Sequence, residues 1–151
     1  VYDFISMLAT NKKADVRVLC ENSACLSSDV NAAYDPTFDS VFEASNSCYL
    51  NHGCVLTKYT GARGKYSSSD ASAEFMAKVI DIMESAGVHW QIGELGAVDV
   101  GGGGTVAQFI AMLNIDVVDL GIPVLAMHAP CEVASKIDLY NAYKAFKAFY
   151  A

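Results

Sequence analysis

Three places in this sequence combine residue types that bind ligands with a position directly after an apolar run. Asp29 follows "CLSS", His128 follows "PVLAM", and Asp99 precedes the four consecutive glycines Gly101–Gly104. A carboxylate and a neutral imidazole are zinc ligands, and bare backbone N–H groups bind anions or polar ligands. In open α/β sheets, ligands lie outside the carboxyl ends of the strands, so residues that end apolar runs are candidates for a site.

The glycine run lacks the pattern of a nucleotide-binding loop. A phosphate loop needs a lysine after its last glycine, and Gly104 is followed by Thr105 and Val106. A dinucleotide fingerprint needs a later glycine in the following helix, which is missing here. A plain turn is the alternative, but four glycines cost more backbone entropy than a turn requires. We therefore expect a ligand to approach this backbone closely.

Neither Asp29 nor His128 establishes a metal site by itself. An aspartate in a polar stretch is more often a turn residue or helix cap, and a lone histidine is more often a hydrogen-bonded core residue. The sequence contains no H-E-x-x-H and no H-x-D motif. The serines at 67–69 lie outside a G-x-S-x-G elbow, so nothing supports a serine nucleophile.

Strand and helix patterns alternate along the chain and must position these residues. Strands are predicted at 16–20, 24–30, 53–60, 88–93 and within 116–127, with a polar loop at 61–70. Helices are predicted at 2–9, from a cap at Ser68, Ser69 or Asp70 to Gly87, at 105–113 and at 131–150. This alternation predicts an α/β fold whose sheet is at least partly parallel.

Composition limits the partners and the compartment. Hydrophobic residues make up 53% of the 151 residues and charged residues 18%, so the chain is either an all-buried α/β domain or part of something larger. The net charge of −7 without a basic cluster argues against nucleic acid and anionic membranes, and no apolar run is long enough to span a membrane. Five cysteines without a C-x-x-C motif indicate buried thiols in a reducing cytoplasm.

Four sequence blocks taken together resemble one enzyme family. The blocks are "LSSDVNAAYDPTF", "SSSDASAEF", "VDVGGGGTVAQFIAMLNIDVVDLGIPVLAMHAP" and "YNAYKAFKAFY". They resemble the aminopeptidase I and aspartyl aminopeptidase family of di-zinc exopeptidases, particularly its bacterial aminopeptidase I branch. The resemblance implies a three-layer α/β/α zinc-exopeptidase-like catalytic domain. Residues 1–151 would then be its C-terminal segment, with the upstream metal-ligand blocks and the dimerisation domain outside this chain.

The resemblance also assigns roles to individual residues. Asp29 stands where the family has its aspartate ligand to one zinc, and His128 stands where it has the histidine ligand to the second. The family's strand lysine falls on Thr57 without a gap, and Lys58 is the nearest lysine. The glycine-and-hydroxyl turn beside the metals, which would hold the peptide substrate, corresponds to Gly102, Gly103, Gly104 and Thr105.

The implied activity is removal of N-terminal residues from peptides by water that two zinc ions activate; manganese and cobalt share such ligands. The segment alone should be inactive, and the complete enzyme should form a homo-oligomer of the family's dodecameric type. Ala32 and Asp35 replace histidines of the aspartyl branch, and Cys131-Glu132 replaces its Arg-Glu pair. We therefore expect neutral or broader specificity. The alternative is a non-catalytic α/β module that binds a small anionic ligand or a protein partner.

Overall fold

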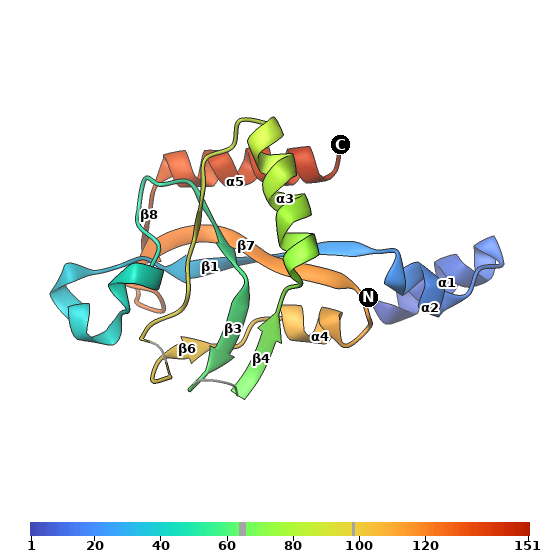
Figure 1. Ribbon diagram of the computed structural model, residues 1–151, viewed down its shortest axis with the longest axis horizontal. Coiled ribbons are helices and arrows are strands. Elements are labelled where there is room, and N and C mark those ends of the chain that lie inside the picture. Colours follow the sequence, from blue (N-terminus) through green and yellow to red (C-terminus); the bar gives the residue numbers. More distant parts are fainter. Residues whose placement is uncertain (64–65, 98) are drawn as a thin grey trace.

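A mixed five-stranded sheet forms the centre of the molecule (Figure 1). The computed structural model describes residues 1–63, 66–97 and 99–151, with the side chains of 62, 66 and 67 left aside. The strand order is β1-β7-β2-β5, with β8 paired to β7. β1 and β7 are parallel, β2 and β5 are parallel, and β2 and β7 are antiparallel. The strands are β1 Ala24–Ala32, β2 Cys54–Thr57, β5 Trp90–Ile92, β7 Asp116–Leu125 and β8 Val133–Ala134.

Helices and a smaller sheet cover the two faces of this central sheet. The three-stranded sheet has the order β4-β3-β6. α3 and α5 both pack on the face of the central sheet that carries the hydrophobic core. In Figure 1, α5 lies above β1 and β7, α3 overlaps them in this view, and β3, β4, β6 and α4 lie below. The predicted α/β class is therefore confirmed. These elements are β3 Tyr59–Ala62, β4 Tyr66–Asp70, β6 Gly102–Gly103, α1 Tyr2–Lys12, α2 Val16–Glu21, α3 Ala73–Ser85, α4 Ala107–Ala111 and α5 Lys136–Phe149, with 3-10 turns at Pro36–Val41 and Ala44–Asn46.

Period-two alternation gives the central sheet one apolar face and one polar face. Leu26 of β1 pairs with Val118 of β7, and both belong to the hydrophobic core. The neighbouring residues, Ser27 paired with Asp119, point to the opposite face. The same alternation puts Asp29 on this second face, opposite Gly121. The polar face is therefore the one that looks toward the glycine run.

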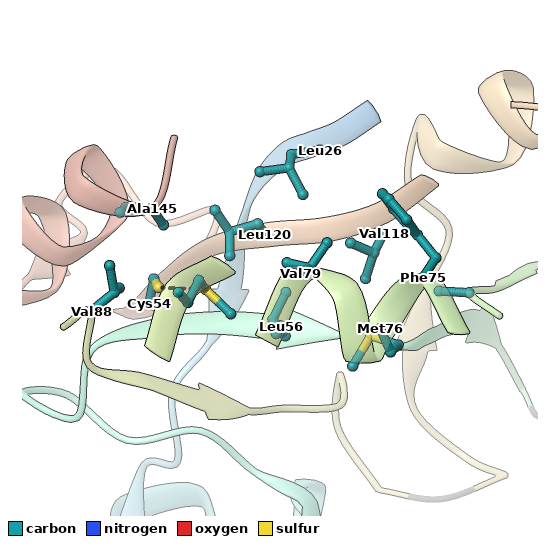
Figure 2. Close-up of a cluster of buried hydrophobic side chains, with 13 residues drawn as sticks. Leu26, Cys54, Leu56, Phe75, Met76, Val79, Val88, Val118, Leu120 and Ala145 are labelled. Carbon is teal, nitrogen blue, oxygen red and sulfur yellow. Dashed lines mark hydrogen bonds between the residues drawn. The ribbon is translucent and has the colours of Figure 1, made fainter. Parts of the chain in front are cut away.

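The apolar face packs against α3 and α5. Figure 2 shows Leu56 and Leu120 of the sheet beside Val79 of α3 and Ala145 of α5. Helical spacing brings the apolar residues of α3 onto one side, and Ser72 caps this helix by accepting the Phe75 N–H at 3.2 Å.

A buried carboxylate joins α5 to the turn before β2. Asp138, with no exposed surface, accepts the backbone N–H of Asn51 and that of Gly53, both at 2.8 Å. Gly53 has φ +94° and a Cβ there would lie 2.0 Å from the carbonyl oxygen of His89, so only glycine fits. Asn141, one turn further along α5, accepts the His89 N–H at 2.9 Å. The C-terminal helix is thus fastened to the sheet by hydrogen bonds as well as by apolar contact.

Two predicted elements have the wrong type. Residues 16–20 form helix α2 and not a strand, because Asp15 caps them by accepting the Arg17 N–H at 2.8 Å and no sheet neighbour pairs with them. The expected polar loop at 61–70 contributes to β3 and β4, which pair with each other at the periphery. Strands that lie off the apolar core carry no hydrophobic alternation to reveal them.

Three helix boundaries also differ from the prediction. The cap of α3 is Ser72, because residues 68–70 belong to β4. α4 covers only Ala107–Ala111, two residues fewer at each end than the predicted 105–113. α5 begins after Ser135, which accepts the Ile137 N–H at 3.2 Å, and β8 precedes it.

Large apolar side chains remain at the surface on several helices. Phe4 and Met7 of α1 are 66% and 72% exposed, and Phe109 of α4 and Met112, which directly follows α4, are 62% and 81% exposed. The apolar side chains are therefore not all buried within this chain, which favours the interpretation that the chain is part of something larger. In the part of the chain that the structure describes, no helix has the length and apolarity needed to cross a bilayer.

Replacing Asp138 should destabilise the chain. Asp138→Ala leaves two backbone N–H groups without their acceptor, so we expect the free energy of unfolding to fall by roughly 2–4 kcal/mol. Asp138→Asn keeps one acceptor oxygen and should lose less. Urea unfolding followed by circular dichroism measures both, with Asp81→Ala on the exposed side of α3 as control. If Asp138→Ala were as stable as the control, the hydrogen bonds to Asp138 would contribute nothing to the stability of the chain.

Gly121 should tolerate no side chain. A Cβ at this position would lie 1.7 Å from the carbonyl oxygen of Asp29, so Gly121→Ala must push β1 away from β7. We expect a loss of about 2 kcal/mol or more. The matched control is Gly103→Ala, whose Cβ would meet only Leu95 Cδ1 at 3.7 Å. Thermal unfolding of the two variants compares them, and a Gly121→Ala midpoint as high as that of Gly103→Ala would contradict the assigned contact.

Candidate metal and substrate site

The polar face of the sheet and the segment after the glycine run enclose a small cavity. Its volume is about 10 Å³, roughly that of a single water molecule. The Thr105 hydroxyl donates to Asp119 Oδ2 at 2.9 Å, and Asn31 Nδ2 donates to Thr57 Oγ1 at 2.7 Å. Two of the predicted site residues, Asp29 and Thr105, are brought together here. The lining is Asp29, Val30, Asn31, Thr57, Thr60, Leu95, Thr105, Asp119 and Gly121.

Asp119 is the principal site residue that the sequence analysis missed. It is 6% exposed, and burial raises the pKa of its carboxyl, with the nearby charge of Asp29 acting in the same direction against the Thr105 hydrogen bond. Oδ1 of Asp119, Oγ of Ser27 and Oγ1 of Thr60 are buried and have no hydrogen-bond partner among the described residues. An acidic residue inside the apolar run of β7 was the signal that could have revealed it.

Asp29 lies within β1 and not at its end, since the strand continues to Ala32. Its side chain is exposed, and Oδ1 accepts the Val30 N–H at 2.7 Å. The other carboxylate oxygen carries no hydrogen bond in the part of the chain that the structure describes. An exposed carboxylate with one available oxygen suits a metal ligand.

His128 follows the end of β7, as expected. The backbone turns there through left-handed conformations, with φ +55° at Ala126 and +67° at His128, and Glu132 Oε1 accepts the His128 N–H at 2.6 Å. The side chain is exposed. Because β1 and β7 are parallel, their carboxyl ends reach the same edge of the sheet. Over residues 1–63, 66–97 and 99–151, no three His, Cys, Asp or Glu side chains form a metal-binding group.

The glycine run is partly a strand. Gly102 and Gly103 form β6 and pair with Ala62 and Gly61 of β3. Gly102 has φ +99°, and the Gly101 N–H donates to the Ala97 carbonyl at 2.7 Å. The backbone structure therefore explains two glycines of the run, whether or not a ligand binds there. Because β6 is the last strand of the order β4-β3-β6, its other edge is unpaired within the described residues.

A larger pocket lies beside the glycine run. Its volume is about 270 Å³, and Gly101 and Gly102 form part of its wall with Glu94. Burial raises the pKa of the Glu94 carboxyl to about 7, against a Tyr59 backbone hydrogen bond that lowers it. Thr60 and Leu95 line this pocket and the small cavity alike, so the two are adjacent.

Lys58 lines neither cavity. Its ammonium forms an ion pair with Asp70 of β4. Thr57, by contrast, is buried and bonded to Asn31. The two residues at which the family lysine could fall are therefore in different surroundings, as the alternation of a strand predicts.

Comparison with known proteins places this geometry in a family. The family described as "Aminopeptidase I zinc metalloprotease (M18)" matches residues 1–150. A Clostridium acetobutylicum protein named probable M18 family aminopeptidase 1 is 44% identical over 99% of this chain and 32% of its own length. Its Thermotoga maritima counterpart is 48% identical over 85% of this chain and 28% of its own. The chain thus spans about a third of the length of these curated relatives.

Solved structures give the same result. The crystal structure of aminopeptidase I from Clostridium acetobutylicum has a TM-score of 0.89 at 43% identity, covering 95% of this chain and 31% of that one. A Saccharomyces cerevisiae structure described as the mApe1 dodecamer has a TM-score of 0.72 at 24% identity over 91% of this chain and 28% of its own, which shows the shared fold. The sequence match over nearly every residue and the common fold agree: the chain belongs to the aminopeptidase I zinc metalloprotease (M18) family.

Proposed function

We propose that this chain is part of a zinc metallo-aminopeptidase, a hydrolase that removes N-terminal amino acids from peptides. In this proposal Asp29 is a ligand of one zinc ion and His128 a ligand of a second. The supporting observation is the polar sheet face, where an exposed carboxylate lies beside the Thr105–Asp119 pair in a chain of a zinc metalloprotease family. Zinc bound there would lower the pKa of a water molecule and polarise the scissile carbonyl.

The glycine run supports the placement of a peptide substrate. β6 is an edge strand of two glycines, and a peptide can add to such an edge by backbone hydrogen bonds. We propose Gly102, Gly103, Gly104 and Thr105 as the residues along which the substrate backbone lies. We also propose that Lys58, which lies between β2 and β3, contacts the same substrate, with Asp70 holding its ammonium.

The remaining ligands and the general base lie outside this chain in the proposal, so the segment alone would not hydrolyse peptides. The exposed apolar side chains of α1 and α4 support burial against other parts of a larger assembly. We infer a homo-oligomer of the dodecameric type. The five free cysteines, three of them buried, support a cytoplasmic location.

Loss of either ligand should remove metal and activity from the complete enzyme. We expect Asp29→Asn and His128→Ala each to lower zinc content and to reduce turnover of a leucine substrate at least about hundredfold, because an incomplete ligand set no longer holds the ion. Elemental analysis and kcat/KM measure the two effects, with Asp81→Asn as control.

Retention of both metals and full activity in these variants would make the ligand assignment wrong. A non-catalytic module that binds a small anion would show no peptidase activity even before the substitutions, and it would bind inorganic phosphate equally well before and after them. Phosphate titration of the same variants therefore separates the two functions.

The complete enzyme should show no preference for acidic N-terminal residues. One reason is that Ala32 and Asp35 stand where the aspartyl branch has histidines. The other is that the Lys58 ammonium, which could bind an acidic side chain, already forms an ion pair with Asp70. Turnover of Asp-, Leu- and Lys-derived aminoacyl substrates tests this. A kcat/KM clearly highest for the Asp substrate would overturn the prediction.

A further inference from the structure

The 270 Å³ pocket beside the glycine run has an acidic wall. The charged residues that line it in the described part of the chain are Glu94 and Asp99. Glu94 is partly buried, and its backbone N–H donates to the Asn46 carbonyl at 2.7 Å, which holds this segment against the pocket. A carboxylate withdrawn from water gains most from a cation placed against it. The pocket therefore has the electrostatic character of a cation site.

Lys58, the basic side chain that acts on Glu94, already has an ion-pair partner. Lys58 lies close enough to lower the pKa of the Glu94 carboxyl, whereas Asp70 raises it. Because Lys58 forms its ion pair with Asp70, the two charges largely cancel at Glu94. The two charged side chains that line the pocket in the described part of the chain, Glu94 and Asp99, are therefore both acidic.

The pocket is joined to the proposed metal site. Thr60, 3% exposed and with a hydroxyl that has no hydrogen-bond partner among the described residues, lines both the pocket and the cavity at Asp29. Gly101 and Gly102 form the pocket's wall on the side of the glycine run. A peptide lying along β6 would therefore pass the mouth of this pocket.

We propose that this pocket is a specificity subsite for a basic side chain, lysine or arginine, of the peptide substrate, with Glu94 as its counter-ion. The inference rests on the proposed peptidase function. The volume favours a side chain over the substrate's α-ammonium group, because a single ammonium needs far less than 270 Å³.

Matched charged and neutral substrates test the subsite in the complete enzyme. We compare kcat/KM for coumarin amides of arginine and its neutral isostere citrulline, and of lysine and norleucine. In Glu94→Gln the arginine-to-citrulline and lysine-to-norleucine ratios should fall about tenfold, since one charge-assisted contact is lost. The neutral substrates should change by less than about twofold. Glu84→Gln, on the exposed end of α3, is the control, and Glu94→Asp should keep part of the preference.

The pH dependence gives a second readout. Glu94 ionises near pH 7, so both ratios should rise between about pH 6 and 8 in the wild type and stay flat in Glu94→Gln. Asp70, Asp99 and Lys58 are the other charged groups described near Glu94, and the contribution of the substrate α-amino group cancels within each pair of substrates.

The outcomes separate this inference from the proposed function. Unchanged ratios in Glu94→Gln, with all four substrates still hydrolysed, would overturn the subsite and leave the aminopeptidase intact. An equal loss on all four substrates would assign Glu94 to the α-amino group or to folding, and would also overturn it. A wild-type enzyme that hydrolyses none of the four would overturn both proposals.

Discussion

The parallel ladder between β1 and β7 is the contact on which the rest of the structure depends. Its register sets which residues point toward α3 and α5 and which point toward the glycine run. A slip of β1 by one residue against β7 would turn Asp29 into the apolar core and bring Leu26 to the polar side. Gly121 lets the two strands come close at the level of Asp29. The hydrophobic core and the candidate site therefore lie on opposite faces of the same pair of strands.

Much of the fold could be predicted from the sequence because its central elements carry strong periodic patterns. The apolar spacing of α3, the run that forms β7 and the long C-terminal helix all follow from such patterns. The strand predicted at 16–20 was wrong because a short apolar run fits helix or strand alike, and the cap at Asp15 decided it. β3 and β4 were missed because they pair outside the core. Polar strands at the periphery of the fold carry no apolar alternation that would reveal them.

The candidate site was predictable as far as residue type reveals chemistry. Asp29, His128 and the glycine run stand out because carboxylate, imidazole and bare backbone have few ordinary reasons to follow apolar runs. Asp119 and Glu94 did not stand out, since their properties come from burial and from neighbours far away in the chain. The division into two adjacent cavities depends on the tertiary packing around Thr60. No pattern along the sequence contains that information.

The hydrogen bonds between Asp138 of α5 and the turn at residues 51–53 have a consequence during translation of the chain. The acceptor of the Asn51 and Gly53 amides lies 87 and 85 residues later in the chain. At the usual pace of translation this separation amounts to roughly 4–17 s. During that interval the turn before β2 lacks the Asp138 carboxylate, and the Asn51 and Gly53 amides form hydrogen bonds with water. A chain cut before Asp138 would therefore keep these two amides without their buried acceptor.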